Sequence, residues 1–227
     1  MLKEFELKDF TRIDVGGVFE VEIVRAEAFA VSLEADDFTH IRVVKLDATL
    51  FISRQGIEWF APFHSRPRAR VTLPVLTGLN VSGASQAELN NLQSAGNLTV
   101  TLSGASHLRA RNIYVNSFDA RVTGASSLSG DCNALKEVLL EVSGASKIEL
   151  AGAAARAVVK VNGASKTDLS KFPVQSADLE ISGASQALVN LNGKLSANVS
   201  GASSLLWSGA PVMGDIQISG ASHLRKQ

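Results

Sequence analysis

Two carboxylates are the strongest candidates for acid–base chemistry in this sequence of 227 residues. Glu149 and Asp168 each stand five residues after the glycine of a Gly-Ala-Ser triplet, in neighbouring copies of a repeat. If equivalent positions stack on adjacent strands, the two carboxyl groups lie ~5 Å apart, the separation of a retaining glycosidase pair. Lys147 and Lys166 stand two residues earlier on the same face, which favours a solvated charge ladder over a catalytic pair.

A second candidate is the segment of residues 59–70, which combines three aromatic residues, two prolines and three arginines. Aromatic faces stack on sugar rings, and guanidinium groups pair with carboxylates or phosphates, so the segment could contact a glycan or an anionic ligand. The simpler interpretation is an irregular loop that covers hydrophobic surface near the N-terminal end. The candidate ligand-binding residues are Trp59, Phe63, His64, Arg66, Arg68 and Arg70.

Other residue types that carry chemistry are sparse. Cys132 is the only cysteine, which excludes a disulfide framework and a thiolate cluster and favours a small buried side chain. The four histidines, His40, His64, His107 and His223, are too scattered to predict a metal site. The serines of the Gly-Ala-Ser triplets lack the second glycine of a nucleophile elbow, and there is no phosphate-binding loop. We therefore predict no catalytic, cofactor-binding or metal-binding residues.

The elements that position these residues follow from a repeat. Gly-Ala-Ser occurs eight times at intervals of 18 to 21 residues, with its glycine at Gly83, Gly104, Gly124, Gly144, Gly163, Gly183, Gly201 and Gly220. The positions two and four residues before the glycine are apolar in every copy, and the position between them is polar. The third position after the glycine is polar and the fourth is mostly apolar. This period-two alternation predicts two strands in each repeat, with one buried face.

Strands that recur in one register every ~20 residues, with no hairpin within a repeat, predict an all-β protein. We expect a parallel β-helix, a solenoid of right-handed coils, with Gly-Ala-Ser at a sharp corner. There the glycine permits a positive φ. The alanine is expected to point into a crowded corner, and the serines to hydrogen-bond along the stack.

The first part of the chain departs from this regularity. Residues 1–78 contain nine of the thirteen aromatic residues and no Gly-Ala-Ser triplet. Residues 15–23 nevertheless align with residues 142–150, and Gly17 precedes Gly83 by 66 residues, a distance of about three coils. We predict that residues 1–78 form degenerate β coils, or a β cap, continuous with the solenoid, and that residues 79–227 form the regular β-helix.

Residues 10–23, residues 71–85 and the repeated Ser-Gly-Ala-Ser units together resemble a bacterial family, the putative auto-transporter adhesins with a head GIN domain. The resemblance covers nearly the whole chain. It implies a β-helical bacterial protein that is often exported to the cell envelope, and it implies no catalytic residues.

Composition limits the partners. Twenty-two basic and 22 acidic side chains balance, which gives no electrostatic reason to expect nucleic acid as a partner. No apolar run is long enough for a membrane span, and no signal peptide is visible at the N-terminus, so the cytoplasm stays open as a location. Because the last repeat is followed by no capping element, we expect either homo-oligomerisation through a coil end or a missing C-terminal segment.

The preferred functional prediction is a non-enzymatic adhesin-like or scaffold protein of the bacterial cell envelope. Its regular polar faces would mediate contact with a cell-surface glycan or protein. The alternative is a β-helix that binds carbohydrate or cleaves polysaccharide along a side face. A third possibility is a purely intracellular assembly module. Converging carboxylates in an ordered cleft would favour the enzyme, and flat polar ladders would favour the scaffold.

Overall fold

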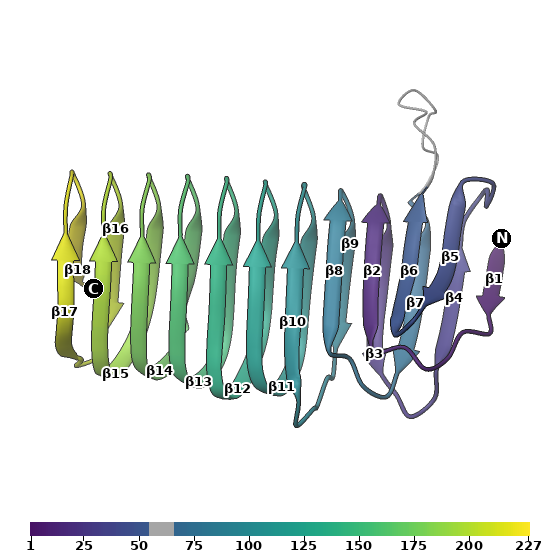
Figure 1. The fold of residues 1–227 in the computed structure, drawn as a ribbon, viewed down its shortest axis with the longest axis horizontal. Coiled ribbons are helices and arrows are strands. Elements are labelled where there is room, and N and C mark those ends of the chain that lie inside the picture. The colour runs from purple at the N-terminus through teal and green to yellow at the C-terminus, as the bar shows by residue number, and fades with distance from the viewer. Residues whose placement is uncertain (55–65) are drawn as a thin grey trace.

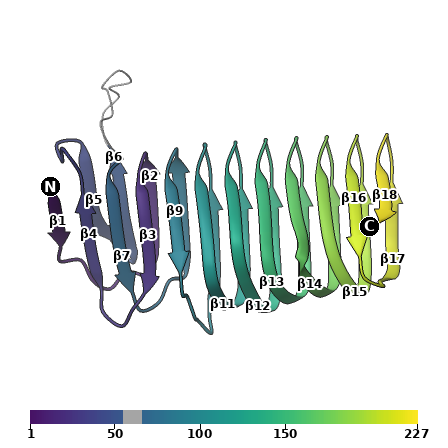
Figure 2. The ribbon, with the colours of Figure 1, turned by 180° about the vertical axis from the view of Figure 1, so that it is seen from behind.

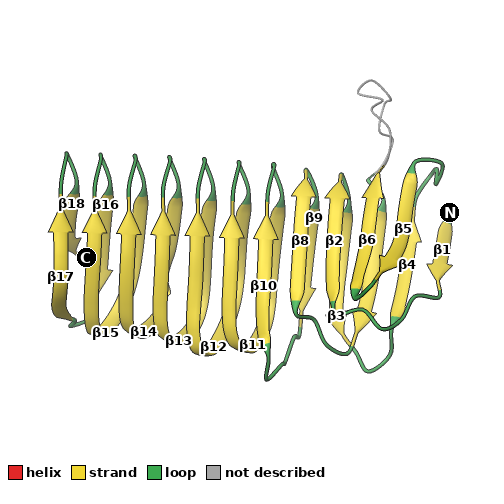
Figure 3. Ribbon diagram, viewed as in Figure 1, coloured by secondary structure: helices red, strands yellow, loops and turns green. Residues whose placement is uncertain are grey.

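The computed structural model describes residues 1–54 and 66–227, and these form a flattened β-solenoid (Figure 1). Two layers of mostly parallel strands, here called the front and back sheets, enclose a single core along the length of the molecule. The described residues contain no helix, and Figure 3 shows loops gathered mainly at the two long edges. The predicted parallel β-helix with coils of about 20 residues is confirmed.

Five long strands each run along the back sheet, bend at one edge and continue in the front sheet. The first half of β11 pairs with β9 and its second half with β10, and later coils repeat this path. These strands are β11 (His107–Val122), β12 (Ser127–Val142), β13 (Lys147–Val161), β14 (Lys166–Ile181) and β15 (Gln186–Val199). The bends form the lower edge in Figure 1, and the Gly-Ala-Ser corners form the upper edge.

Shorter strands complete both sheets. The remaining front strands are β5 (Ile41–Leu46), β6 (Thr49–Arg54), β2 (Arg12–Gly17), β8 (Gly78–Gly83), β10 (Asn97–Leu102) and β17 (Val212–Ile218). The remaining back strands are β1 (Leu2–Phe5), β4 (Ala30–Glu34), β7 (Arg68–Leu73), β3 (Glu20–Arg25), β9 (Gln86–Asn90), β16 (Ser204–Ser208) and β18 (His223–Lys226). In most of them, such as β6 and β9, buried residues alternate with more exposed ones, as the period of two predicts, whereas the terminal strands β1, β17 and β18 contain no buried residue.

The upper edge is held by glycine and serine. Gly144 has a φ of +80°, and a Cβ atom there would lie 2.5 Å from the carbonyl oxygen of Gly124 in the preceding coil. That space is available only to glycine. The hydroxyl of Ser146 is buried and donates a hydrogen bond of 3.2 Å to the same oxygen. The predicted hydrogen bonding of serines along the stack is therefore confirmed.

The prediction for the alanine of the triplet is wrong. The alanines from Ala105 to Ala221 are exposed on the outside of the corner, whereas the serines of the same triplets are mostly buried. The positive φ at the glycine changes the direction of the chain, so three consecutive residues face solvent before the serine turns inward. The crowded positions belong to glycine and serine.

The predicted distance of about three coils between Gly17 and Gly83 is also wrong. β2 pairs in parallel with β8, and Gly17 lies directly beside Gly83. On its other side β2 pairs with β6, while β3 lies between β7 and β9 in the same way. The chain thus forms the β2–β3 coil first, extends outward to build β4 to β7, and returns to continue the stack (Figures 1 and 2).

Aromatic side chains and antiparallel strands fill this N-terminal end. β4 pairs antiparallel with β1 and β7, and β5 pairs antiparallel with β6. Phe10 and Phe19 are fully buried, and the ring of Phe10 lies 5.0 Å from that of Phe29. The buried phenylalanines among residues 1–54 therefore give a bulkier core at this end.

Candidate functional site

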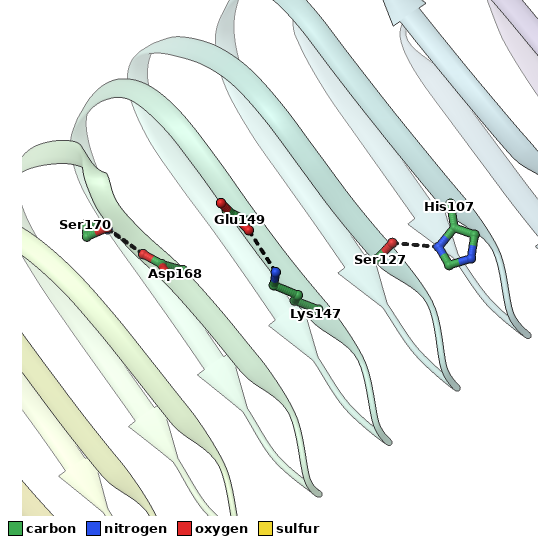
Figure 4. Close-up of polar contacts among 6 residues, drawn as sticks. All are labelled: His107, Ser127, Lys147, Glu149, Asp168 and Ser170. Atoms are coloured by element: carbon green, nitrogen blue, oxygen red, sulfur yellow. Dashed lines mark hydrogen bonds and ion pairs between the residues drawn. The ribbon is translucent and has the colours of Figure 1, made fainter.

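The outer surface of the back sheet carries the side chains that the sequence marked for acid–base chemistry (Figure 4). His107, Ser127 and Lys147 occupy one position in three successive coils. Glu149 and Asp168 are direct neighbours on β13 and β14, so the predicted juxtaposition of the two carboxylates is confirmed. Parallel in-register pairing places them at the spacing of adjacent strands, ~4.8 Å.

Each of these carboxylates already has a partner on its own strand. Lys147 Nζ lies 2.8 Å from Glu149 Oε2. Asp168 Oδ1 accepts hydrogen bonds from Ser170 Oγ at 2.6 Å and from its backbone N–H at 3.1 Å. The two pairs lie side by side on an open strand surface, as Figure 4 shows.

Their electrostatics oppose a role as general acid. The hydrogen bond from Lys147 and its positive charge lower the pKa of Glu149. For Asp168, desolvation raises the pKa, but the hydrogen bonds from Ser170 together with the charges of Lys166 and Lys147 outweigh it and leave the pKa below its usual value. A glycosidase needs one carboxyl group that stays protonated near neutral pH, which requires a raised pKa. This pair therefore stays ionised and has the character of a charge ladder.

His107 and Ser127 form the other pair in this row. His107 Nδ1 lies 2.7 Å from Ser127 Oγ, and the hydrogen bond joins adjacent coils. A serine nucleophile needs a histidine base that a third group orients. In residues 1–54 and 66–227, the other ring nitrogen of His107 has no hydrogen-bond partner. The pair therefore acts as a link between coils.

The arginine segment ends on the same sheet, nearer the N-terminal end. Arg68 Nε lies 2.9 Å from Glu20 Oε2, and Arg70 Nε lies 3.5 Å from Glu22 Oε2, both across the β7–β3 pair. Arg66 is exposed just before β7. Trp59, Phe63 and His64 lie outside the described residues. The structure thus places Arg68 and Arg70 together, in a depression of about 400 Å³ where glutamates balance their charge.

Three further observations concern metals, membranes and the cysteine. In the described ranges, no cluster of three or more His, Cys, Asp or Glu side chains could hold a metal ion. Nor do those ranges contain a helix with the length and apolar character of a membrane span. The Cys132 thiol is buried, and desolvation together with the charge of Asp131 raises its pKa to about 12. It is therefore a core side chain without nucleophilic character.

The lower edge contains a shallow groove that sequence reasoning missed. Its volume is about 910 Å³. The groove crosses several coils, and Gln93, Tyr114, Asn133 and Ala153 occupy one position in successive turns. Leu135, Ala154 and Gln175 also line it. The available signal was Tyr114, the only tyrosine of the chain, in a return segment that differs from every other copy.

Comparison with solved structures supports the fold. A putative adhesin from Parabacteroides distasonis superimposes with a TM-score of 0.87 at 16% identity, covering 100% of this chain and 96% of that one. A putative adhesin from Parabacteroides merdae gives a TM-score of 0.84 at 16% identity, with 100% and 95% covered. A second P. distasonis protein, described as a putative lipid binding protein, gives 0.83 at 16% identity, with 100% and 96% covered. At this identity the likeness concerns the fold alone.

Sequence comparison assigns the family. No curated protein matches the sequence. The model of the family described as "Putative auto-transporter adhesin, head GIN domain" matches residues 9–211, which is most of the chain. The protein therefore belongs to the family of putative auto-transporter adhesins with a head GIN domain.

Proposed function

We propose that this chain is a non-enzymatic adhesin-like or scaffold protein that presents flat polar faces to a cell-surface partner. The observation that carries the proposal is the state of the Glu149–Asp168 pair. Both carboxylates are engaged by neighbouring side chains and have lowered pKa values on an open surface. Such a surface offers many small contacts, while the pair lacks the protonated acid that polysaccharide cleavage needs.

The pattern of ion pairs elsewhere supports the same reading. On the front sheet, Lys160 faces Glu180 in the next coil, and Arg121 faces Glu141. At the lower edge, Arg156 Nη2 lies 2.6 Å from Asp178 Oδ2. Matched charges across coils keep each face near neutrality, so recognition would depend on shape and hydrogen bonding more than on net charge.

The bacterial cell envelope is the proposed location, because the family is named for adhesins. A glycan or a protein on a cell surface is the proposed partner class. The arginine segment is a proposed contact region, with Arg66, Arg68 and Arg70 beside Trp59, Phe63 and His64 in the sequence. Because Arg68 and Arg70 are paired with glutamates, a ligand would have to compete with those ion pairs.

Self-association through the β17–β18 coil end is a further part of the proposal. β17 pairs only with β15, and β18 pairs only with β16, which leaves one edge of each strand without a partner among the described residues. Val212 is 71% exposed and Ile218 is 48% exposed on this coil. A second copy would cover these apolar side chains and pair with the strand edges.

The function is tested by measuring binding and cleavage on the same polysaccharides. The full chain, immobilised on beads, is incubated with bacterial capsule and cell-wall polysaccharides, and retention and release of reducing ends are both recorded. We expect the wild type to retain polysaccharide. We also expect it to release no more reducing ends than the Glu149→Gln/Asp168→Asn control does. Reducing ends released by the wild type and lost in that double variant would overturn the proposal and establish the enzymatic alternative.

The arginine segment and the coil end have separate tests. Unchanged retention after Trp59→Ala and Arg68→Ala, with the fold intact, would exclude the segment as a contact. For self-association, light scattering across micromolar concentrations should show a dimer that Ile218→Lys converts to a monomer. A wild-type chain that is monomeric throughout that range would contradict association through the coil end.

A further inference from the structure

The lower-edge groove contains polar side chains without partners. The amides of Gln93, Asn133 and Gln175 and the hydroxyl of Tyr114 make no hydrogen bond with another residue in the described part of the chain. Elsewhere on the same edge, amides are paired. Asn112 Nδ2 donates to Asn91 Oδ1 at 2.9 Å, and Asn116 Nδ2 donates to Asn97 Oδ1 at 2.9 Å. These two amide pairs join the same two coils as Gln93 and Tyr114 and flank them, so the unpaired polar side chains lie between paired ones.

The apolar part of the groove is exposed in an unusual way for this protein. Tyr114 is 47% exposed and Leu135 is 78% exposed, and both line the groove. Between them and Gln175 the floor consists of small side chains, including Ala153 and Ala154. An exposed aromatic face beside a methyl-lined floor, with a few polar groups at the rim, is the composition of a site for a small organic ligand.

The charge of the groove limits the ligand class. Among the described residues, Arg25 is the only charged one that lines the groove, and Arg25 Nε donates a hydrogen bond of 3.3 Å to the carbonyl oxygen of Pro74. None of the described lining residues is a carboxylate. By contrast, the depression on the back sheet is lined by glutamates such as Glu20 and by Arg68 and Arg70. Arg25 belongs to the coil before that of Gln93, so its charge lies at one end of the groove. The other described lining residues are uncharged and offer a neutral ligand hydrogen bonds and apolar contacts.

The dimensions favour an extended ligand. Gln93, Tyr114, Asn133 and Ala153 follow one another in successive coils, so the first and last are about 14 Å apart at the strand spacing of a sheet. The connection between β9 and β10 extends beyond the neighbouring bends (Figure 1), and its residues Gln93, Ser94 and Ala95 line the groove. A chain of a few sugar rings matches this length, and each ring spans roughly one coil.

We propose that the lower-edge groove binds a neutral oligosaccharide. One pyranose ring stacks on the face of Tyr114, and the amides of Gln93, Asn133 and Gln175 exchange hydrogen bonds with sugar hydroxyls. The proposal rests on the proposed function in one respect, namely that the chain binds the oligosaccharide and does not cleave it. The groove supplies a specific contact, whereas the flat sheets supply only extended surface.

The test is calorimetric titration of the full chain with cello-, xylo-, manno- and chitohexaose, with hexagalacturonate as the anionic probe. Ala153→Arg fills the groove with a long charged side chain. Ala184→Arg places the same side chain on an exposed alanine of the upper edge, and is the matched control. We expect at least one neutral hexasaccharide to bind, Ala153→Arg to weaken it about tenfold or more, and Ala184→Arg to change it less than about twofold.

A second pair of variants keeps the test decisive if Ala153→Arg disturbs folding. Tyr114→Phe retains the ring and is expected to retain most of the affinity, whereas Tyr114→Ala loses the stacking and about as much affinity as Ala153→Arg. Absence of binding by every neutral probe at millimolar concentration would overturn the site. So would equal binding by the wild type and Ala153→Arg, or binding of hexagalacturonate or phosphatidylcholine vesicles in place of neutral sugars.

Recovery of the ligand after titration separates this proposal from the proposed function. Intact hexasaccharide supports both. Shorter products, formed by the wild type and still formed by Glu149→Gln/Asp168→Asn, would overturn the non-enzymatic function while leaving the groove as the binding site.

Discussion

At the upper edge each regular coil turns with the same three residues, whereas at the lower edge the return segments differ in length and composition. The upper corners stack so closely that the carbonyl oxygen of Gly124 contacts both Ala145 N and Ser146 Oγ of the next coil. The lower bends have register shifts, as between Ala134 and Glu137 in the β12–β13 pair. Tight stacking allows no variation in the backbone path at the upper edge. The lower edge is stacked less tightly and can accommodate a groove.

The largest effect is expected at a glycine of the upper edge. Gly144→Ala places a methyl group 2.5 Å from the carbonyl oxygen of Gly124 at a φ of +80°. We expect a loss of about 2–4 kcal/mol in the free energy of unfolding, because strain and overlap both act in the folded state. Chemical denaturation followed by circular dichroism measures it.

Ala145→Leu is the matched control, one residue away. Because Ala145 is exposed, a larger side chain there is expected to change stability by less than about 0.5 kcal/mol. A loss at Ala145 as large as that at Gly144 would contradict the assignment of crowding to the glycine.

The serine column gives the next effect. Ser146→Ala removes a buried hydroxyl that donates to Gly124 O, and it leaves an acceptor with one partner fewer. We expect a loss of about 1–2 kcal/mol, measured by the same denaturation. Ser129→Ala, on the outer surface of the back sheet, is expected to leave stability nearly unchanged. An equal loss of stability at both serines would contradict the structural role assigned to the buried serine column.

Cys132 probes the core beneath the lower edge. Its pKa of about 12 lies above the unfolded value of 9.0, so its contribution to stability is complete below pH 9 and is lost as the pH rises toward 12. Between pH 8 and pH 10, the free energy of unfolding of the wild type should fall by about 1 kcal/mol more than that of Cys132→Ala. Parallel pH profiles for the two proteins would show that burial does not perturb the thiol.

The smallest effect is a gain at Thr167. This residue takes the fourth position after a triplet glycine, where most copies have an aliphatic side chain, and its buried hydroxyl has no hydrogen-bond partner among the residues that the structure describes. Thr167→Val keeps the shape and removes the unsatisfied group, so stability should rise by about 0.5–1 kcal/mol. A decrease on thermal denaturation would indicate that the hydroxyl finds a partner, such as an internal water molecule.

The candidate chemistry was predicted only in part. Stacking of equivalent positions predicted that Glu149 and Asp168 would be neighbours, because register follows directly from the repeat. The sequence could not predict the hydrogen bond from Ser170 to Asp168, because it depends on the local bend of the backbone within β14. The lower-edge groove beside Tyr114 could not be predicted either, because its lining residues belong to return segments that share no sequence pattern.

By itself, the sequence determined the structure of a single coil, namely which side chains are buried and where the chain turns. Alternation with a period of two specifies which side chains are buried, and a glycine at each corner specifies where the chain turns, because both are local properties of the backbone. Only the tertiary structure decided which coils are neighbours and which corner residue points inward. The β2–β3 coil lies between β6–β7 and β8–β9 because strand edges of similar pattern can pair in several orders, and non-local packing of the aromatic N-terminal core selects one.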